Sequence, residues 1–204
     1  MKNLMIKRTL RFFFTVILVL TFTGCWIPEK FTATVTINKD GSHSFIYEGI
    51  LTNGFVLGVI QKGMLTPADE AKLKDEEKTL LKAPGFKKAT YLGKGRYEVL
   101  VERHYKAGEA GRFISRDAEI FSVIPGKDGI ITVTGLKLTP GNIKEFNEFG
   151  AKVDGKLKVT VADGVTVISH NAMSEPSFFG LFGAYEWEIK SPDVAPTMKV
   201  RPGS

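Results

Sequence analysis

Residues 31–50 read FTATVTINKDGSHSFIYEGI, and this stretch decides the fold. Apolar and polar side chains alternate without a break over its first eight residues, which is the period of a half-buried strand. The Asp-Gly pair at positions 40 and 41 is a turn signal, and residues 43–50 supply the return strand. The stretch therefore predicts a β-hairpin.

The rest of the chain repeats this pattern. Strand pairs are predicted at 87–92 with 96–105, at 119–124 with 130–136, and at 156–161 with 165–170, followed by a last strand at 185–190. An apolar stretch at 54–65 contains Gly58 and Gly63, which weaken a helix. It is either a short helix or a buried connection.

Two helices are predicted between the hairpins. Thr66 can cap the first helix, Pro67 fits its first position, and Asp69 can reach back as in a capping box; the helix should run to about Lys82. The second helix should run from Thr139-Pro140 to Gly150. These elements predict an α+β fold, in which mostly antiparallel β-hairpins form one sheet that carries two short capped helices.

The first 25 residues predict export. Four bases and a short apolar run at 12–23 precede Gly24 and Cys25, and this order is typical of a secretory signal. The apolar run is shorter than the roughly 20 residues that span a bilayer, which disfavours an uncleaved anchor. Cys25 is the only cysteine of the chain. An ordinary secretory signal with an accidental cysteine remains the alternative.

Thr23-Gly24-Cys25 resembles the lipobox of bacterial lipoproteins, although Phe22 stands where that motif usually has Leu. The resemblance implies a signal peptide at 1–24, a diacylglyceryl group on Cys25 and a short lipidated tether at 25–30. The remaining length, 31–204, fits a single domain with its own core, or at most two small ones. A tether of five residues beyond Cys25 reaches at most roughly 17 Å, so the domain should lie against the membrane. Trp26 in place of Asp implies the outer membrane in a Gram-negative host.

The charge of the mature chain excludes an obvious nucleic-acid partner. The full chain has 28 Lys and Arg against 22 Asp and Glu. Removing residues 1–24 takes away four bases and no acids, which leaves 24 against 22, a net charge of +2. The high pI therefore belongs mostly to the signal. A lipidated Cys25 also leaves the domain without a disulfide, so packing alone must stabilise it.

The order of parts resembles the LppM-like domain of bacterial surface lipoproteins. A lipobox is followed at once by a strand, an Asp-Gly turn and a strand, then by a charged helix and a run of hairpins. Residues 165–172 lead to a late Tyr-x-Trp strand at Tyr185-Glu186-Trp187, after an extra loop at 173–183. The resemblance implies an envelope lipoprotein with an α+β domain and no established catalytic residues.

No catalytic or metal-binding pattern is found in the sequence. Glu102 and His104 share one face of a strand, but a solvated face is the better interpretation than a metal or acid–base site. Ser169 and His170 are adjacent on a strand and so point to opposite faces, which disfavours a nucleophile–base pair. We therefore expect no enzyme activity, no cofactor and no metal.

A Phe-rich segment at 177–183 contains Phe178, Phe179, Leu181 and Phe182. Either these side chains fill the core beside Trp187, or they form an exposed apolar surface that contacts the bilayer or a lipid-like ligand. The sequence thus predicts a lipoprotein, anchored to the membrane through Cys25, whose extracytoplasmic domain binds a lipid or another envelope component. The alternative is a structural or assembly partner of an envelope protein complex.

Overall fold

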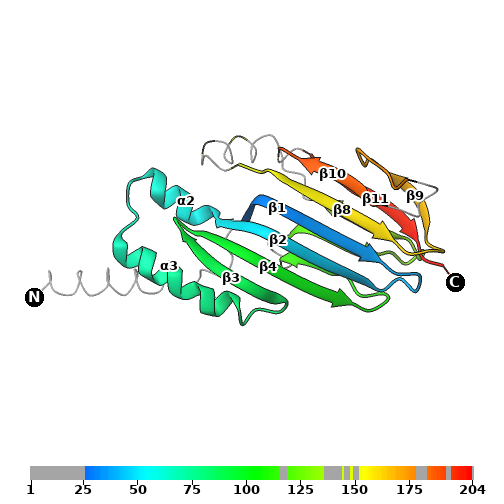
Figure 1. Ribbon diagram of the computed structural model, residues 1–204, viewed down its shortest axis with the longest axis horizontal. Helices are drawn as coiled ribbons and strands as arrows, with labels where there is room; N and C mark the ends of the chain where they lie inside the picture. The colour runs from blue at the N-terminus through cyan, green and yellow to red at the C-terminus, as the bar shows by residue number, and fades with distance from the viewer. Residues whose placement is uncertain are drawn as a thin grey trace, which may run out of the picture.

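The computed structural model describes residues 26–114, 119–135, 152–177, 183–191 and 194–203, together with Lys144 and Glu148. Eleven strands lie within these residues and form two β-sheets, one behind the other in Figure 1. The predicted signal peptide and Cys25 lie outside the described residues.

The larger sheet, sheet A, is organised around β1. Its six strands follow the order β10 (Tyr185–Ile189), β8 (Gly155–Val161), β1 (Trp26–Ile37), β2 (His43–Asn53), β4 (Arg96–Tyr105) and β3 (Phe86–Gly93). The predicted hairpin is confirmed, because β1 pairs antiparallel with β2, with Thr34 opposite Ile46. Its turn needs a glycine, since Gly41 has a φ of 82°. On its other side β1 pairs in parallel with β8.

The smaller sheet, sheet B, has five strands. They follow the order β5 (Gly111–Ile114), β6 (Glu119–Pro125), β7 (Ile131–Gly135), β11 (Thr197–Arg201) and β9 (Thr166–His170). The predicted hairpin of β6 and β7 is confirmed, with Val123 opposite Val133. The strand β11 lies between β7 and β9 and pairs antiparallel with both.

Aromatic side chains join the two sheets. The ring of Phe113 in sheet B lies 4.8 Å from Phe45 and 4.7 Å from Tyr47 in sheet A, measured between centroids. Phe31 contacts Phe121 of sheet B at 5.8 Å. Such offset and tilted pairs are the favoured geometry for packed rings. The core therefore lies between the inner faces of the sheets.

Two helices stand at one end of sheet A (Figure 1): α2 (Gly54–Gln61) and α3 (Pro67–Leu80). The apolar stretch at 54–65 is thus a short helix in its first part. The first predicted helix is confirmed as α3, with Leu73 and Leu80 buried against the sheet. The second predicted helix, at 139–150, lies outside the described residues except for the helical Lys144 and Glu148.

The predicted α+β class, with one sheet and two capped helices, is wrong. The described residues are mostly β structure in two packed sheets. The error has a physical cause at the turn of Asp163 and Gly164. A hairpin was predicted there, but β8 pairs with β1 in sheet A while β9 pairs with β11 in sheet B. Each sheet has one apolar face, and each buries that face against the other.

The predicted tether also has a different structure. Residues 26–30 are the first part of β1, and Ile27 is buried. Trp26 lies opposite Asn53 at the far end of β2. The described part of the domain therefore begins within a strand, at Trp26.

Candidate functional site

The start of β1 lies beside both helices. The backbone N–H of Asn53 donates to the carbonyl of Gly95 in the β3–β4 turn at 2.9 Å, and the Asn53 side chain caps α2. The ring of Trp26 meets Tyr97 edge-on at 5.7 Å. We call this part of the molecule the α2 end; it comprises Trp26, α2, residues 62–67 and the turn at 93–95.

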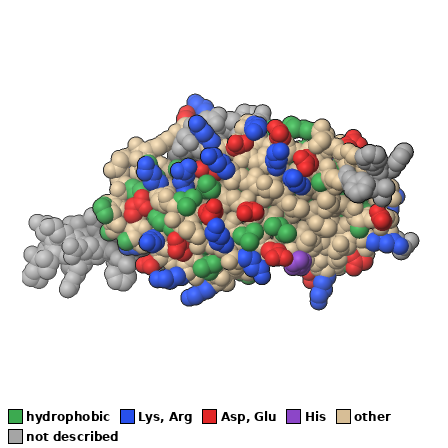
Figure 2. Space-filling model, viewed as in Figure 1, with side chains coloured by type: hydrophobic (Ala, Val, Ile, Leu, Met, Phe, Trp, Pro, Cys, Tyr) green, Lys and Arg blue, Asp and Glu red, His purple; other side chains and the backbone are tan. Residues whose placement is uncertain are grey.

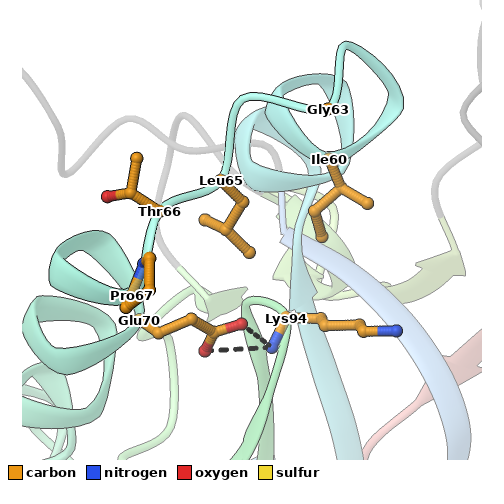
Figure 3. A pocket seen from close by; sticks show the side chains of 7 residues that line it. All are labelled: Ile60, Gly63, Leu65, Thr66, Pro67, Glu70 and Lys94. Carbon is orange, nitrogen blue, oxygen red and sulfur yellow. Dashed lines mark hydrogen bonds between the residues drawn. The ribbon is translucent and has the colours of Figure 1, made fainter.

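An open pocket of about 560 Å³ lies at the α2 end. Its lining combines α2, the loop that follows, the start of α3 and the turn: Ile60, Gly63, Leu65, Thr66, Pro67, Glu70 and Lys94. In Figure 3 the side chains of Ile60 and Leu65 point into the space between these elements, and Lys94 extends away from Glu70. The pocket is thus mainly apolar, with one acid and one base at its rim.

Glu70 fixes the turn at the rim of this pocket. Its carboxylate accepts hydrogen bonds from the backbone N–H of Lys94, at 3.2 Å and 3.4 Å, and from the Tyr91 hydroxyl. The Tyr91 hydroxyl in turn accepts from the N–H of Gly95 at 3.2 Å. These bonds fix a turn in which Lys94, at a φ of 54°, is the one non-glycine residue with a positive φ in the described chain.

The tyrosines behind the pocket are hydrogen-bond donors rather than acids. Burial, helped by the hydrogen bond to Glu70, raises the pKa of Tyr91 to about 12. Burial and the nearby Glu76 raise the pKa of Tyr97 well above its usual value. The Tyr97 hydroxyl donates to the Leu73 carbonyl at 2.7 Å. Both hydroxyls remain protonated at neutral pH and attach α3 to sheet A.

The capping box predicted for α3 is present at the mouth of the pocket. The N–H of Asp69 donates to the Thr66 hydroxyl at 3.2 Å, and the Asp69 carboxylate accepts from the Thr66 N–H at 3.1 Å. The hydroxyl of Thr66 also donates to this carboxylate at 2.6 Å, and the hydrogen bonds together lower the pKa of Asp69. The cap fixes the point where the pocket loop becomes helix.

The residues singled out in the sequence are only partly placed. Cys25 and the Phe-rich candidates lie outside the described residues: Phe178, Phe179, Leu181 and Phe182. Trp187, beside which a buried Phe segment was expected, is 1% exposed. Its indole N–H donates to Asn171 at 2.7 Å.

The structure describes both polar pairs. His104 Nε2 lies 3.0 Å from Glu102 Oε1 on a solvent-exposed face, with His104 72% exposed. His170 accepts from the Ala172 N–H at 3.2 Å and faces Glu175 at 3.5 Å, so it is not engaged by Ser169. The described residues contain no group of three or more His, Cys, Asp or Glu side chains placed to hold a metal ion.

Sequence reasoning did not single out His43, which is 2% exposed. Within the described part of the chain neither ring nitrogen has a hydrogen-bond partner, and the ring stacks on Tyr105 at 4.9 Å. Burial lowers the pKa of His43, against the smaller upward pull of the Gly41 carbonyl and Glu109. The sequence could have predicted this burial, because His43 occupies the same alternate positions of the strand as Phe45 and Tyr47, which face the core.

Comparison with solved structures gives a distant similarity. No protein-family model matches the chain, and no curated protein matches it. Among solved structures, the chain is similar to the NMR structure of the folded domain of the Mycobacterium tuberculosis LppM protein. The TM-score is 0.42 and the identity 13%, with 91% of this chain and 95% of the LppM domain covered.

Proposed function

We propose that the chain is a bacterial envelope lipoprotein, lipidated at Cys25, whose extracytoplasmic domain binds a lipid or another envelope component. The proposal includes the outer membrane as its location where the host has one, and a binding role rather than a catalytic one. One observation carries it: the apolar pocket lies at the end of the domain where the chain arrives from Cys25.

The pocket has the chemistry of an acyl-chain site. Ile60 and Leu65 offer apolar contact, while Glu70 and Lys94 place polar groups at the rim. Binding sites for lipid-like molecules combine an apolar wall with a few polar groups that fix orientation. A domain held directly at the membrane meets such ligands at high local concentration.

Lipidation is tested by changing Cys25→Ser in cells supplied with labelled palmitate. The wild-type protein should incorporate label and fractionate with the membrane, whereas the variant should do neither. A variant that still takes up label and stays in the membrane would refute lipidation at Cys25. Membrane separation in a Gram-negative host tests the location.

Ligand binding is tested on the purified, lipidated full chain with a fluorescent fatty-acyl probe. Leu65→Asp places a charge in the pocket and should weaken binding about tenfold or more, which is about 1.4 kcal/mol. The matched control is Ile168→Asp, because Ile168 is an exposed apolar side chain of sheet B. Equal binding by both variants and the wild type would exclude the pocket.

The assembly alternative has its own observation. In the described chain β9 pairs on one side only, with β11, and Ile168 on this strand is 44% exposed. An open strand edge is a surface that another chain can extend. A photo-crosslinking side chain at position 168 should give one discrete protein adduct in intact cells under this alternative, and none under the lipid-binding proposal.

A further inference from the structure

Helix α2 carries apolar side chains that stay exposed in the part of the chain that the structure describes. Its sequence, GFVLGVIQ, contains no charged residue, and Val56 is its one buried residue. Val56 packs over the β3–β4 turn so tightly that a Cβ on Gly95 would lie 2.7 Å from it. Leu57 packs near Ile27. The helix is therefore firmly attached through one side.

The opposite side of α2 and the loop after it carry apolar side chains that are exposed, Phe55 and Met64, or half-buried, Val59. Phe55 and Val59 are one helical turn apart and so share a face. The N–H of Met64 donates to the Val59 carbonyl at 3.1 Å, which brings Met64 to the same region. Phe55 is 70% exposed and Met64 62%. We call Phe55, Val59 and Met64 the apolar lip.

The position of the lip relative to the anchor is set by the fold. Trp26 pairs with Asn53, and Asn53 caps α2. Cys25 precedes Trp26 directly, and one residue extends the chain by only about 3.5 Å. A lipid on Cys25 therefore holds the α2 end, rather than the opposite end of the sheets, at the bilayer surface.

The charges around the lip also suit a membrane surface. Lys62 and Lys94 are exposed at the α2 end, and no ion pair is found for either within the described residues. The nearby acid Glu29 is occupied by Arg96 at 3.1 Å. Figure 2 shows hydrophobic, basic and acidic side chains interspersed at this end. Apolar side chains flanked by Lys are typical of segments that lie in the interface of a bilayer with anionic lipids.

We propose that α2 lies in the interfacial layer of the bilayer that holds the Cys25 lipid, with the apolar lip among the acyl chains. This inference rests on the lipoprotein function proposed above. An eight-residue helix is about 12 Å long, which suits an orientation in the membrane plane. Neither described helix is long and apolar enough to cross a membrane. Docking would give the domain a fixed orientation, with the pocket mouth at the lipid headgroups.

The test uses the lipidated full chain in vesicles of phosphatidylethanolamine and phosphatidylglycerol. Acylation makes Cys25 unreactive, so Phe55→Cys and Met64→Cys each supply a single thiol for a polarity-sensitive fluorophore. Met173→Cys is the matched control, because Met173 is 65% exposed and its backbone N–H bonds to Glu186 on the edge strand β10, about halfway along the length of sheet A. Glu186 pairs with Lys158 of β8, and Lys158 pairs with Thr34 of β1. Thr34 is eight residues from Trp26, which is about 25 Å along the strand.

Labels at 55 and 64 should shift to the blue and lose at least half of their emission to nitroxide-bearing lipids, while the label at 173 should do neither. Labels at 55 and 64 that behave like the label at 173, on protein that floats with the vesicles, would overturn docking and leave the lipoprotein function intact. Shielding in native envelopes but not in pure lipid would also overturn docking, in favour of a protein partner.

The wild-type chain separates the two proposals. A wild-type protein that takes up a thiol label and does not float with vesicles lacks the lipid on Cys25, which would overturn the proposed function and the docking together. A second pair of variants, Phe55→Asp with Met64→Cys and Phe55→Ala with Met64→Cys, checks the lip itself. The label at 64 should lose its shielding with Asp more than with Ala.

Discussion

Two apolar segments of this chain have opposite environments. In β1, Ala33, Val35 and Ile37 are 0% exposed, because sheet B covers the inner face of sheet A. In α2, a segment without a charged residue, only Val56 is buried. The contrast shows that an apolar sequence is buried only where the fold supplies a facing surface. For β1 the chain supplies that surface, and for α2 we propose that the bilayer does.

The largest expected effect is in the core. Trp187→Ala removes a fully buried ring from sheet A and leaves the Asn171 side chain without its indole donor. It should lower the free energy of unfolding by about 3–5 kcal/mol, measured by urea denaturation followed by circular dichroism. A loss below about 1 kcal/mol would mean that this part of the sheet is not tightly packed.

Replacing a glycine with alanine should destabilise the protein in the core and stabilise it in α2. Gly155→Ala places a Cβ 2.3 Å from the ring of Phe31 and should cost about 1–3 kcal/mol. Gly58→Ala lies inside α2 and should stabilise the helix by about 0.5–1 kcal/mol. Thermal melts of both variants beside the wild type give the comparison. Destabilisation by Gly58→Ala would show that α2 is packed more closely than its exposure indicates.

The buried His43 should make folding sensitive to pH. Burial lowers its pKa in the folded state, so the unfolded chain binds the proton more readily. Stability should therefore be full above the unfolded pKa of about 6.5 and decrease as the pH falls towards the folded pKa, by at most about 1.4 kcal/mol per pH unit.

The His43 contribution is isolated by urea melts at pH 8 and pH 5.5 of the wild type and of His43→Phe. The variant should lose part of the pH dependence, since no proton can bind at that position. The groups that face His43 remain in both proteins: Tyr105 on β4, the Gly41 carbonyl in the turn, and Glu109 before β5. Identical pH profiles would assign the dependence to other groups.

A smaller effect is expected at the mouth of the pocket. Thr66→Ala removes the side-chain cap of α3 and should cost about 1 kcal/mol. Thr66→Ser keeps the hydroxyl and should retain most of the stability. Amide hydrogen exchange at the first turn of α3 locates the loss, and exchange that rises equally throughout sheet B would contradict a local role.

The smallest effect is expected at the apolar lip. Phe55→Ala should change the free energy of unfolding by no more than about 0.5 kcal/mol in detergent-solubilised protein, because the ring is 70% exposed. Compared with Trp187→Ala, this change measures the contrast between the two regions directly. A cost of several kcal/mol would mean that the ring stabilises the fold.

Local patterns predicted the local elements. The Asp-Gly turn and its flanking alternation predicted β1 and β2, and Thr66 with Asp69 predicted the capping box seen in α3. In β4, Tyr97, Val99 and Val101 alternate with less buried residues and lie on one buried face. These features depend on residues close together in sequence, whose spacing carries the information.

Pairing between distant segments was not predictable in the same way. The parallel contact of β1 with β8 joins residues more than 120 positions apart, and no spacing rule encodes it. The strand β11 was overlooked although Met198 and Val200 alternate with Thr197, Lys199 and Arg201, because five residues give a weak periodic signal. The pocket depends on how α2, α3 and a turn meet, which is again a distant relation.

The central place of β1 has a mechanical consequence. The lipid on Cys25 would be joined without slack to a strand that is bonded to β2 on one side and β8 on the other. A force that pulls the domain from the membrane acts along β1 and loads both ladders in shear, so their hydrogen bonds share the load. An anchor on an edge strand would load one ladder instead of two. Because forced unfolding is governed by its rate, this attachment should resist extraction of the anchor strand.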